Sequence, residues 1–554
     1  MKNWIKSVAL ATFAALASPG AIAATYYLSD CQAGATAGCV VGSDAANGTT
    51  PSTPKRNVAA LPALLAGDTV SFARGGSWSF PSPWYPGFGT KTAPKTYNSF
   101  QAAWCTSGTC LTQKPLLNAA VNIGLVAFTN GGSSSHKEGV VLKDLELKAG
   151  AGSTDLFSAA VFIYNDSDYI TLDNLDISGF GLGISIQGTN EVGPGSDGIN
   201  NNITIRNSNI HDNLNLGLQG AATDLLIENN RFDNNGKGAG CSNRCHNLYL
   251  ALYPMVNERI VVRGNTLTRS GRATTATCNG SSLEGHGNLR DLIIENNTID
   301  ESTGASGGCY GIQLTTLSIA YPNEVMANIV IRGNRVVNVG GVGIGLAGCT
   351  SCVVENNVIV WDDSATHVGI HLPNGPQGDD GVQEKVTVRN NSIYFAKADS
   401  TSRGIHLDTY GANHKVISNL IYFGPASAAG RVCFQTGPLT MYDAFDNNLC
   451  YHAGPGGKWS PTYGTLAAAQ TAGYDTHGIS ADPLFLAMPN AVNGYGLSLR
   501  PDSPAVNIGH RTLSAPTDIT GRARGTGPDV GAWQIGPSAV NLVPPAAPTG
   551  VIVQ

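Results

Sequence analysis

Two short alternating patterns of apolar and polar residues recur along the middle of the chain. One starts with Gly and continues apolar-x-apolar, at residues 183–186, 311–314, 343–346, 369–372 and 404–407. The other is apolar-x-apolar followed closely by Asn, at residues 203–207, 226–230, 293–297 and 386–391. Alternation with a period of two is typical of β-strands, and helical spacing is absent from these segments. The pattern therefore predicts an all-β chain built from many short strands.

The Asn-containing pattern returns at intervals of about 23 to 37 residues, close to positions 170, 203, 226, 260, 292, 329, 353, 386 and 416. Two strands per interval, with Gly and Asn at the corners, suit a coil that stacks on itself. Asn tolerates a left-handed backbone there, and stacked Asn side chains can form a ladder. One turn cannot bury its apolar side alone, but about nine stacked turns share a continuous core roughly 45 Å long. We expect a solenoid of about nine or more turns.

The repeats resemble the right-handed parallel β-helix of the pectate-lyase-like superfamily, over roughly residues 25–535. Segments near both ends are also similar to segments of secreted members, at 26–29, 47–49 and 65–72 and at 482–485, 499–505 and 529–533. The resemblance implies an all-β, single-stranded right-handed parallel β-helix. Because the superfamily contains lyases, hydrolases, epimerases and phage spikes, it does not by itself imply one activity.

The two ends of the chain differ from the repeats. Lys2 and Lys6 precede an apolar run over 8–17 and an Ala-Ile-Ala sequence at 21–23, which predicts a secretory signal cleaved after Ala23 or Ala24. A Pro- and Ala-rich tail over 536–554 is typical of a linker or frayed end. After the signal we expect an N-terminal cap with the first turns (24–140), a core with an active groove (141–435) and the closing turns (436–535). The mature protein is expected to be secreted or periplasmic.

Composition narrows the classes of function. Gly accounts for 68 of 554 residues, 13% are charged and 42% are hydrophobic, which excludes wholesale disorder and disfavours a helical bundle or coiled coil. The formal net charge of −6 offers no basic excess for phosphate contacts, so nucleic acid is not an expected partner. No later stretch is apolar for long enough to span a bilayer. We expect a monomer without a membrane span.

Twelve cysteines follow the predicted signal and fall into pairs of near neighbours. The pairs are Cys31/Cys39, Cys105/Cys110, Cys241/Cys245, Cys278/Cys309, Cys349/Cys352 and Cys433/Cys450. An even count in an exported protein favours structural disulfides. The alternative is zinc, because Cys349-x-x-Cys352 has the spacing of metal ligands, although no second CxxC or HxxxH accompanies it.

Side chains alternate between the inside and the outside of such a coil, so aligning the repeats predicts which residues face outward. The first outward column reads Ser185, Gly217, Tyr249, Glu284, Gln313, Gly345, His371 and His406. The second, two residues further on, reads Gln187, Gln219, Ala251, His286, Thr315, Ala347, Pro373 and Asp408. A surface strip that holds Tyr, His, Glu, Asp and Gln but no Lys is a candidate substrate groove.

Ionisable side chains are concentrated near the middle of this strip. Arg244, His246 and Tyr249 share one predicted turn, and Glu284 and His286 share the next. Neighbouring turns lie about 5 Å apart, so these five groups can meet around one sugar of a substrate. We predict that they are the catalytic residues.

Several chemistries were weighed for this centre. A glycoside hydrolase needs two carboxylates roughly 5 to 10 Å apart, but the only acids in the two columns, Glu284 and Asp408, are four turns or about 19 Å apart. The Asn-Thr-Asp signature of polygalacturonases and the Asp-Pro-His-Asp segment of epimerases with this fold are both absent. Hydrolysis and C5 epimerisation are therefore disfavoured, without being excluded.

β-Elimination on a uronic acid requires a group that neutralises the carboxylate, a base for the C5 proton and an acid for the leaving oxygen. Arg244 can hold a carboxylate with its planar fork, His246 or His286 can be the base, and Tyr249 can donate to the leaving oxygen. We therefore predict a lyase acting on an acidic polysaccharide. The alternative is a non-catalytic surface or matrix protein that binds glycan, in which Tyr249 only stacks on sugars and Glu284 only pairs with neighbouring groups.

Residues around this centre are predicted to bind the substrate. They are Gln219, Asn247, Gln313, His371, His406 and Asp408. The last three form a second cluster, for which distal sugar subsites, a metal site and solvated surface are all open. No cofactor is certain. Calcium is a possibility at Asp379-Asp380, since hard cations favour oxygen ligands, but an ordinary solvated loop is the simpler interpretation.

Overall fold

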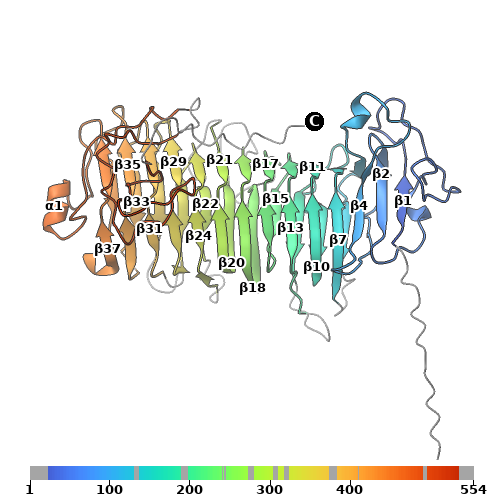
Figure 1. Cartoon of the computed structure of the whole chain (residues 1–554), viewed down its shortest axis with the longest axis horizontal. Coiled ribbons are helices and arrows are strands. Elements are labelled where there is room, and N and C mark those ends of the chain that lie inside the picture. Colours follow the sequence, from blue (N-terminus) through green and yellow to red (C-terminus); the bar gives the residue numbers. More distant parts are fainter. Residues whose placement is uncertain are drawn as a thin grey trace, which may run out of the picture.

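The computed structural model describes residues 23–129, 136–188, 197–239, 241, 245–271, 280–302, 310–316, 324–373, 383–409, 411–490 and 496–535. Their strands pair in parallel with the strand one turn away, and the turns lie side by side along the long axis of the molecule (Figure 1). Three ladders of strands run along this stack. The predicted fold, an all-β parallel β-helix, is confirmed.

The first ladder carries the predicted site. Its strands are β6 (Val126–Thr129), β9 (Ala159–Tyr164), β12 (Leu182–Gln187), β15 (Leu216–Gly220), the first part of β18 (Leu248–Arg263), the first part of β20 (Ser281–Glu295), β22 (Tyr310–Leu314), β26 (Val342–Leu346), β30 (Val368–Leu372), β33 (Arg403–Leu407) and β36 (Val432–Gln435).

The second ladder continues from the first around each turn. Its strands are β1 (Thr25–Leu28), β2 (Thr69–Ala73), β4 (Lys95–Phe100), β7 (Lys137–Lys143), β10 (Ser167–Asp173), β13 (Ile203–Arg206), β16 (Leu226–Glu228), the later parts of β18 and β20, β24 (Val330–Arg332), β28 (Val353–Glu355), β31 (Thr387–Arg389), β34 (His414–Ile417) and β37 (Tyr442–Asp446). The short strands β23 (Met326–Ala327) and β27 (Cys349–Thr350) lie between the two ladders.

The third ladder has 13 strands, one for each turn. They are β3 (Ser77–Phe80), β5 (Leu116–Ala119), β8 (Glu146–Lys148), β11 (Asp176–Ser178), β14 (Asn209–His211), β17 (Arg231–Asp233), β19 (Thr266–Thr268), β21 (Thr298–Asp300), β25 (Arg335–Val337), β29 (Val358–Trp361), β32 (Ser392–Phe395), β35 (Leu420–Phe423) and β38 (Leu449–His452). The stack is therefore longer than the repeat pattern alone indicates.

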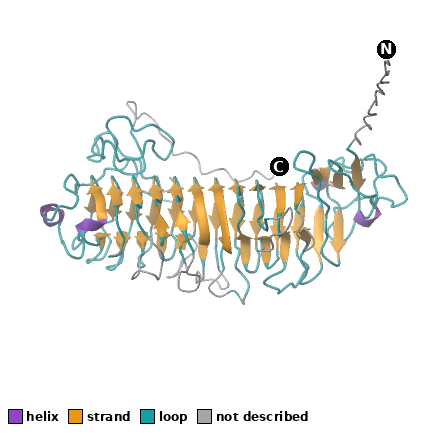
Figure 2. Ribbon diagram, turned by 90° about the horizontal axis from the view of Figure 1, so that it is seen from below, coloured by secondary structure: helices purple, strands orange, loops and turns teal. Residues whose placement is uncertain are grey.

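Helical turns are few and lie at the two ends of the stack (Figure 2). They are η1 (Val58–Ala60), η2 (Thr109–Leu111), η3 (Leu439–Met441) and α1 (Leu466–Thr471). The Thr465 hydroxyl caps α1 by accepting a hydrogen bond from the Ala468 N–H at 3.2 Å. Within the described residues, no helix is long and apolar enough to cross a membrane.

Each middle turn has three strands rather than the predicted two. The reason is the Asn corner, which divides the second repeat pattern. Strand β16 ends at Glu228, Asn229 adopts a left-handed φ of 54°, and β17 begins at Arg231. Asn296, Asn356 and Asn390 take the same conformation at equivalent corners. The prediction that Asn supplies the left-handed corners is therefore confirmed.

A continuous ladder of asparagine side chains runs through the interior. Each Nδ2 group donates to Oδ1 of the Asn one turn further on, at 3.0 to 3.1 Å, and the last Asn donates to Asp475 at 3.2 Å. The members are Asn230, Asn265, Asn297, Asn334, Asn357, Asn391, Asn419 and Asn448, all buried. Their second Nδ2 hydrogen bond goes to a backbone carbonyl, for example from Asn357 to Ile331 at 2.9 Å. The ladder satisfies polar groups at the corners, where strand pairing cannot.

The segment after the last turn folds back over the outside of the third ladder. Its apolar residues Leu497, Val530 and Trp533 pack against Val360 and Tyr422 of that ladder. Buried Arg524 donates to Asn356 Oδ1 at 2.8 Å, which ties the segment to one of the left-handed corners.

Candidate functional site

The candidate catalytic residues lie on the outer face of the first ladder. Leu248, Leu250 and Leu283 point into the core and are fully buried. The alternating residues Tyr249 and Glu284 therefore point outward, and strand register places them directly opposite each other. Gln313 of β22 lies opposite Glu284 on the following turn. The predicted juxtaposition of these three side chains is present in the structure.

One position of the predicted outward column is wrong. Register pairs Ser185 with Gln219, and Gln219 with Tyr249, so Gln219 occupies the place predicted for Gly217. A Cβ atom on Gly217 would lie 2.4 Å from the Asn247 carbonyl oxygen and 2.8 Å from the Asn235 side chain. Gly217 thus takes the place of Gly183 at the start of the repeat, two residues before Gln219, so the predicted alignment of this turn is out of register by two residues.

Asn247, which is predicted to contact substrate, takes the position of Gly217 on the next turn. Asn247 is fully buried. Its Nδ2 group donates to the Thr268 carbonyl and its Oδ1 atom accepts from Asn235 Nδ2, both at 2.9 Å. The side chain belongs to a short interior ladder with Asn235 and is not available at the surface, so we exclude it from the proposed site.

Tyr249 and His286 meet on neighbouring turns of the outer face. The Tyr249 hydroxyl is hydrogen-bonded to His286 Nε2. On the other side of the imidazole, His286 Nδ1 lies 3.3 Å from Oε1 of Glu324, whose side chain is completely buried. With its proton on Nδ1, on the side of Glu324, His286 directs its Nε2 lone pair at the phenol.

His246 supports Tyr249 from the side. The two rings stack with centroids 5.1 Å apart and an interplanar angle of 24°. His246 Nδ1 accepts the backbone N–H of Ser281 at 3.0 Å, so this nitrogen carries no proton. A neutral His246 therefore has its proton on Nε2 and acts as a donor. Between the two predicted bases, the hydrogen bonds favour His286.

Glu284 is a buried carboxyl group beside the pair. Burial raises its pKa to about 8, although a hydrogen bond from the Ser281 hydroxyl, at 2.8 Å, opposes the shift. The same hydroxyl lies 3.3 Å from Gln313 Oε1. Burial, with a smaller contribution from Glu284, raises the pKa of nearby Tyr310. At neutral pH Glu284 is thus protonated and can donate a hydrogen bond.

Three residues of this site were not predicted from the sequence. Ser281 and Tyr310 lie on neighbouring turns of one column, three residues before Glu284 and Gln313. Extending the alignment to the residue before the repeat Gly, as in Tyr310-Gly311, would have found them. Glu324 lies two residues before β23, and the adjacent Val325 N–H donates to the Asn288 side chain at 2.8 Å. No strand pattern identifies Glu324, because it lies outside the strand.

Some predicted residues lie outside the described part of the chain. They are Arg244, Cys278, Cys309, Asp379 and Asp380. The role of Arg244 as the clamp for the substrate carboxylate and the calcium site therefore stay predictions. Cys245, immediately before His246, is joined to Cys241 and is fully buried.

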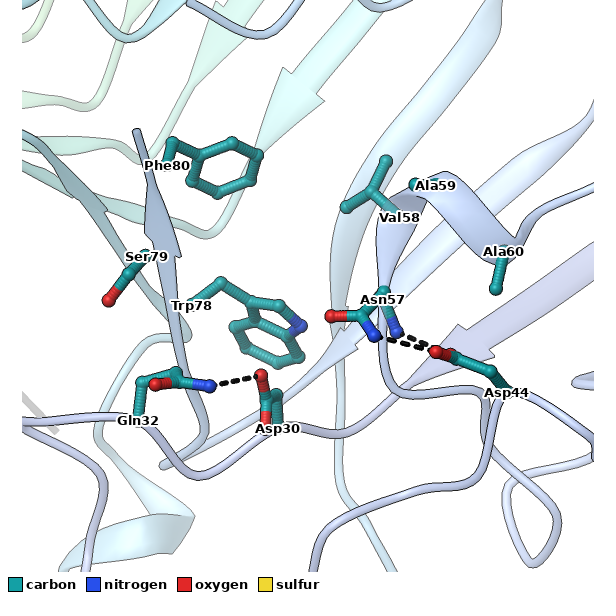
Figure 3. Close-up of a pocket in the computed structure, with 10 residues that line it drawn as sticks. All are labelled: Asp30, Gln32, Asp44, Asn57, Val58, Ala59, Ala60, Trp78, Ser79 and Phe80. Atoms are coloured by element: carbon teal, nitrogen blue, oxygen red, sulfur yellow. Dashed lines mark hydrogen bonds between the residues drawn. The ribbon is translucent and has the colours of Figure 1, made fainter. Parts of the chain in front are cut away.

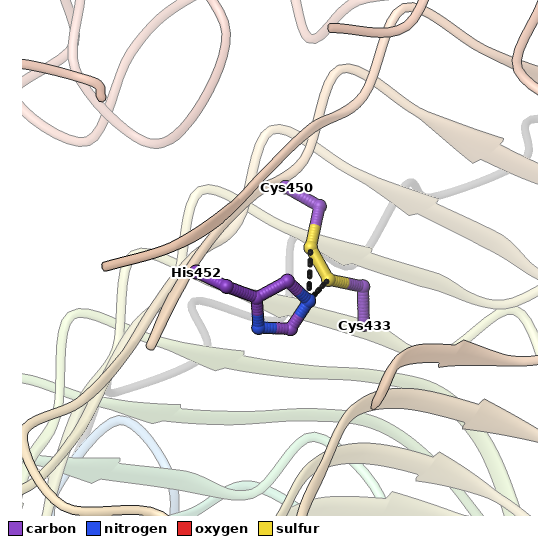
Figure 4. A group of neighbouring side chains, drawn as sticks. All are labelled: Cys433, Cys450 and His452. Carbon is purple, nitrogen blue, oxygen red and sulfur yellow. Dashed lines mark hydrogen bonds between the residues drawn. A yellow bond between two sulfur atoms is a disulfide. The ribbon is translucent and has the colours of Figure 1, made fainter. Parts of the chain in front are cut away.

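The described cysteines are paired as predicted. The disulfides are Cys31–Cys39, Cys105–Cys110, Cys241–Cys245, Cys349–Cys352 and Cys433–Cys450. A disulfide leaves Cys349 and Cys352 without thiolates, so they do not provide a zinc site. His452 Nε2 lies 3.2 Å from Cys433 Sγ beside the last of these bonds (Figure 4). Burial lowers the pKa of His452 to about 4, with a smaller contribution from Arg431.

The second predicted cluster is also assembled. His371 and His406 lie opposite each other on consecutive turns, with their rings stacked 4.4 Å apart. His406 Nε2 lies 2.9 Å and His371 Nε2 lies 3.8 Å from the Asp408 carboxylate. The two imidazoles beside it, His371 and His406, hold the pKa of Asp408 well below its usual range. Gln313 and Gly345 separate this cluster from Glu284 along the column.

A separate pocket of about 570 Å³ lies at the N-terminal end of the stack (Figure 3). It is lined by Asp30, Gln32, Asp44, Asn57, Val58, Ala59, Ala60, Trp78, Ser79 and Phe80. Asp30 accepts from Gln32, and Asp44 accepts from Asn57. This pocket contains none of the predicted catalytic residues.

Comparisons with known proteins concern the fold. No protein-family model matches the chain, and no curated protein is similar to it in sequence. Solved structures with a similar arrangement include the pectate lyase Pel9A, with 12% identity, a TM-score of 0.40 and coverage of 93% of this chain and 98% of that one. The parallel β-helix fold of this chain follows from the strand pairing described above.

Two further structures are similar to this β-helix. The A-module of the Azotobacter vinelandii mannuronan C-5 epimerase AlgE4 has 15% identity and a TM-score of 0.42, covering 67% of this chain and 90% of that module. A mannuronic acid specific polysaccharide family 6 lyase from human gut microbiota has 13% identity and a TM-score of 0.44, covering 78% of this chain and 88% of that enzyme. At these identities the activity must be argued from the site itself.

Proposed function

We propose that this protein is an exported lyase that cleaves a uronic-acid-containing polysaccharide by β-elimination. The observation that carries the proposal is the hydrogen bond between Tyr249 and His286, with Glu324 behind the imidazole. Such a unit can take up a proton and return it in one catalytic cycle, which elimination requires. The five disulfides support export to an oxidising compartment.

In the proposed reaction, Tyr249 transfers its phenol proton to His286 and the resulting phenolate removes the C5 proton of the uronic acid. The C5–H bond breaks, the C4=C5 double bond forms and the C4–O bond to the next sugar breaks. The leaving oxygen then takes up the proton held by the Tyr249–His286 pair. Both residues return to their starting protonation states, and no oxidant or reductant is consumed.

The developing negative charge on the substrate carboxylate requires hydrogen-bond donors. Protonated Glu284 and the neighbouring Gln313 lie on the two turns that follow Tyr249 on the same outer face. His246 is a further donor through Nε2. We propose that these groups bind the carboxylate together, with Arg244 adding charge as the sequence predicts.

Hydrolysis is less well supported by the same geometry. Register places Asp408 and Glu284 four turns apart, or about 19 Å, which is beyond the separation of glycosidase carboxylates. The nearer acid, Glu324, is completely buried behind His286 and does not face a substrate on the surface.

The test is a screen of purified protein against alginate, pectate, glucuronans and glycosaminoglycans, followed by absorbance of the unsaturated uronate. We expect absorbance to rise with at least one of these polymers. New reducing ends without this absorbance would indicate hydrolysis, and solvent proton exchange at C5 without chain shortening would indicate epimerisation. Saturable binding with no turnover on any polymer would favour the glycan-binding alternative.

The protonation of Glu284 predicts how activity depends on pH. With a folded-state pKa of about 8, the side chain loses its proton as pH rises through that value, and activity should fall there. Glu284→Gln keeps a neutral donor, so we expect it to retain most activity and to lose this alkaline limb. An alkaline limb unchanged in Glu284→Gln would contradict the role of Glu284.

Glu284 should also affect stability. Its folded pKa is about 8, above the ordinary value of 4.5, so between these pH values the folded state holds a proton that the unfolded state has released. Stability contributed by this group therefore falls as pH rises through that window. Compared with wild type, Glu284→Gln should gain stability at pH 9 relative to pH 5 in urea unfolding. The partly exposed Glu258→Gln is the control and should show no such change.

A further inference from the structure

The His371–His406–Asp408 cluster has a geometry that proton transfer at Tyr249 does not use. His371 projects from β30, His406 from β33, and Asp408 follows β33 by one residue. Strand register therefore stacks the two imidazoles and sets the carboxylate beside them, on the outer face of the helix. Side chains from two consecutive turns of one surface therefore meet at a single point.

Ligand atoms of the three side chains converge there. One nitrogen from each histidine and one carboxylate oxygen all lie within 4.8 Å of one another. Both Nε2 atoms are buried, and neither makes an aligned hydrogen bond within the described residues, although each faces the Asp408 carboxylate. Two imidazole lone pairs and a carboxylate directed at one point form a ligand set for a cation.

We propose that His371, His406 and Asp408 bind one divalent transition-metal ion of the Zn²⁺ or Co²⁺ type. Imidazole nitrogens suit these ions, whereas Ca²⁺ and Mg²⁺ favour oxygen ligands. Three protein ligands leave coordination positions open to water or to a substrate oxygen. The site is about 14 Å, or three turns, from Glu284 along the same outer face.

Arg403, a neighbouring cation, makes hydrogen bonds of its own. It lies three residues before His406 on β33, and its guanidinium donates to Gln435 Oε1 at 2.5 Å and to the Thr401 carbonyl at 3.0 Å. Gln435, opposite His406 on the next turn, is therefore engaged by Arg403. Among the described residues of these turns, we expect no protein ligand beyond the three named.

The test uses the full mature protein, freed of metal by chelation and then dialysed. Titration with Co²⁺, followed by d–d absorbance, and titration with Zn²⁺ in a calorimeter should each show one equivalent bound. His371→Ala, His406→Ala and Asp408→Asn should each weaken binding at least tenfold. His477→Ala is the matched control, because His477 forms an exposed pair with one carboxylate only, that of Asp446, and its affinity should not change.

A second measurement does not depend on variants that fold. X-ray absorption of the Zn²⁺-loaded wild-type protein should show two imidazole ligands, oxygen ligands and no sulfur. Absence of saturable binding to folded protein, one equivalent that persists in the His371→Ala/His406→Ala double variant, or a sulfur ligand would each overturn the proposal. None of these readouts measures polysaccharide cleavage, so they test the metal site independently of the proposed lyase activity.

Discussion

Tyr249→Phe is expected to reduce the rate of polysaccharide cleavage by about a thousandfold, the usual order for loss of a positioned acid–base group. The variant keeps the ring that stacks on His246 but lacks the hydroxyl bonded to His286, so it removes the proton carrier with little change in packing. The measurement is the initial rate of unsaturated uronate formation at saturating substrate. KM should change much less than kcat.

Two further variants sharpen this test. Tyr164→Phe, at the stacked Phe162–Tyr164 pair on the same ladder, is the matched control and should retain wild-type activity. Glu324→Gln should lower kcat less than Tyr249→Phe and should move the pH profile, because it alters the proton on His286 without touching substrate. A Tyr249→Phe variant that is folded and within about threefold of the wild-type rate would refute the proposed proton transfer.

Asn357→Ala is expected to destabilise the folded protein by about 3 kcal/mol, since each buried polar group left without a partner costs about 1 to 3 kcal/mol. Asn357 is fully buried and donates to Ile331 O and to Asn391 Oδ1. It also accepts from the side chain and backbone N–H of Asn334. Removing the Asn357 amide therefore leaves several buried polar groups without a hydrogen-bond partner at once.

The measurement for Asn357→Ala is reversible urea unfolding followed by circular dichroism. Asn209→Ala is the control, because Asn209 is a partly exposed strand residue on β14 whose side-chain hydrogen bonds join Asp176 and Arg231. Asn209→Ala should lower the free energy of unfolding by less than about 1 kcal/mol. Equal destabilisation by the two substitutions would mean that the interior ladder contributes no more than a surface hydrogen bond.

Much of the fold and part of the site could be predicted from strand alternation. A period of two determines which side chains face outward, so Tyr249, Glu284, Gln313, His371 and His406 were placed in one column correctly. The prediction failed at one turn, where Gly217 rather than Gln219 was aligned with Ser185. Asn247 takes the place of the repeat Gly on the next turn and is buried, which alternation along a single strand does not reveal.

Other parts of the site depend on contacts between distant segments. Glu324 contacts His286 across a separation of 38 residues in the sequence. The acceptor role of His246 Nδ1 follows from a backbone N–H on the next turn, at Ser281. Neither contact has a signature in the local sequence, since both are made across turns whose lengths vary.

The sequence by itself determined the parallel β-helix, the asparagine corners and the pairing of the described cysteines, because these follow from residue type and from spacing along the chain. Only the tertiary structure decided which polar atoms meet. The phenol of Tyr249 and the imidazole of His286, and likewise the two Nε2 atoms beside Asp408, are brought together by the register between turns. Register is set by the stacked core and its Asn ladder, which act over the whole molecule and not within one repeat.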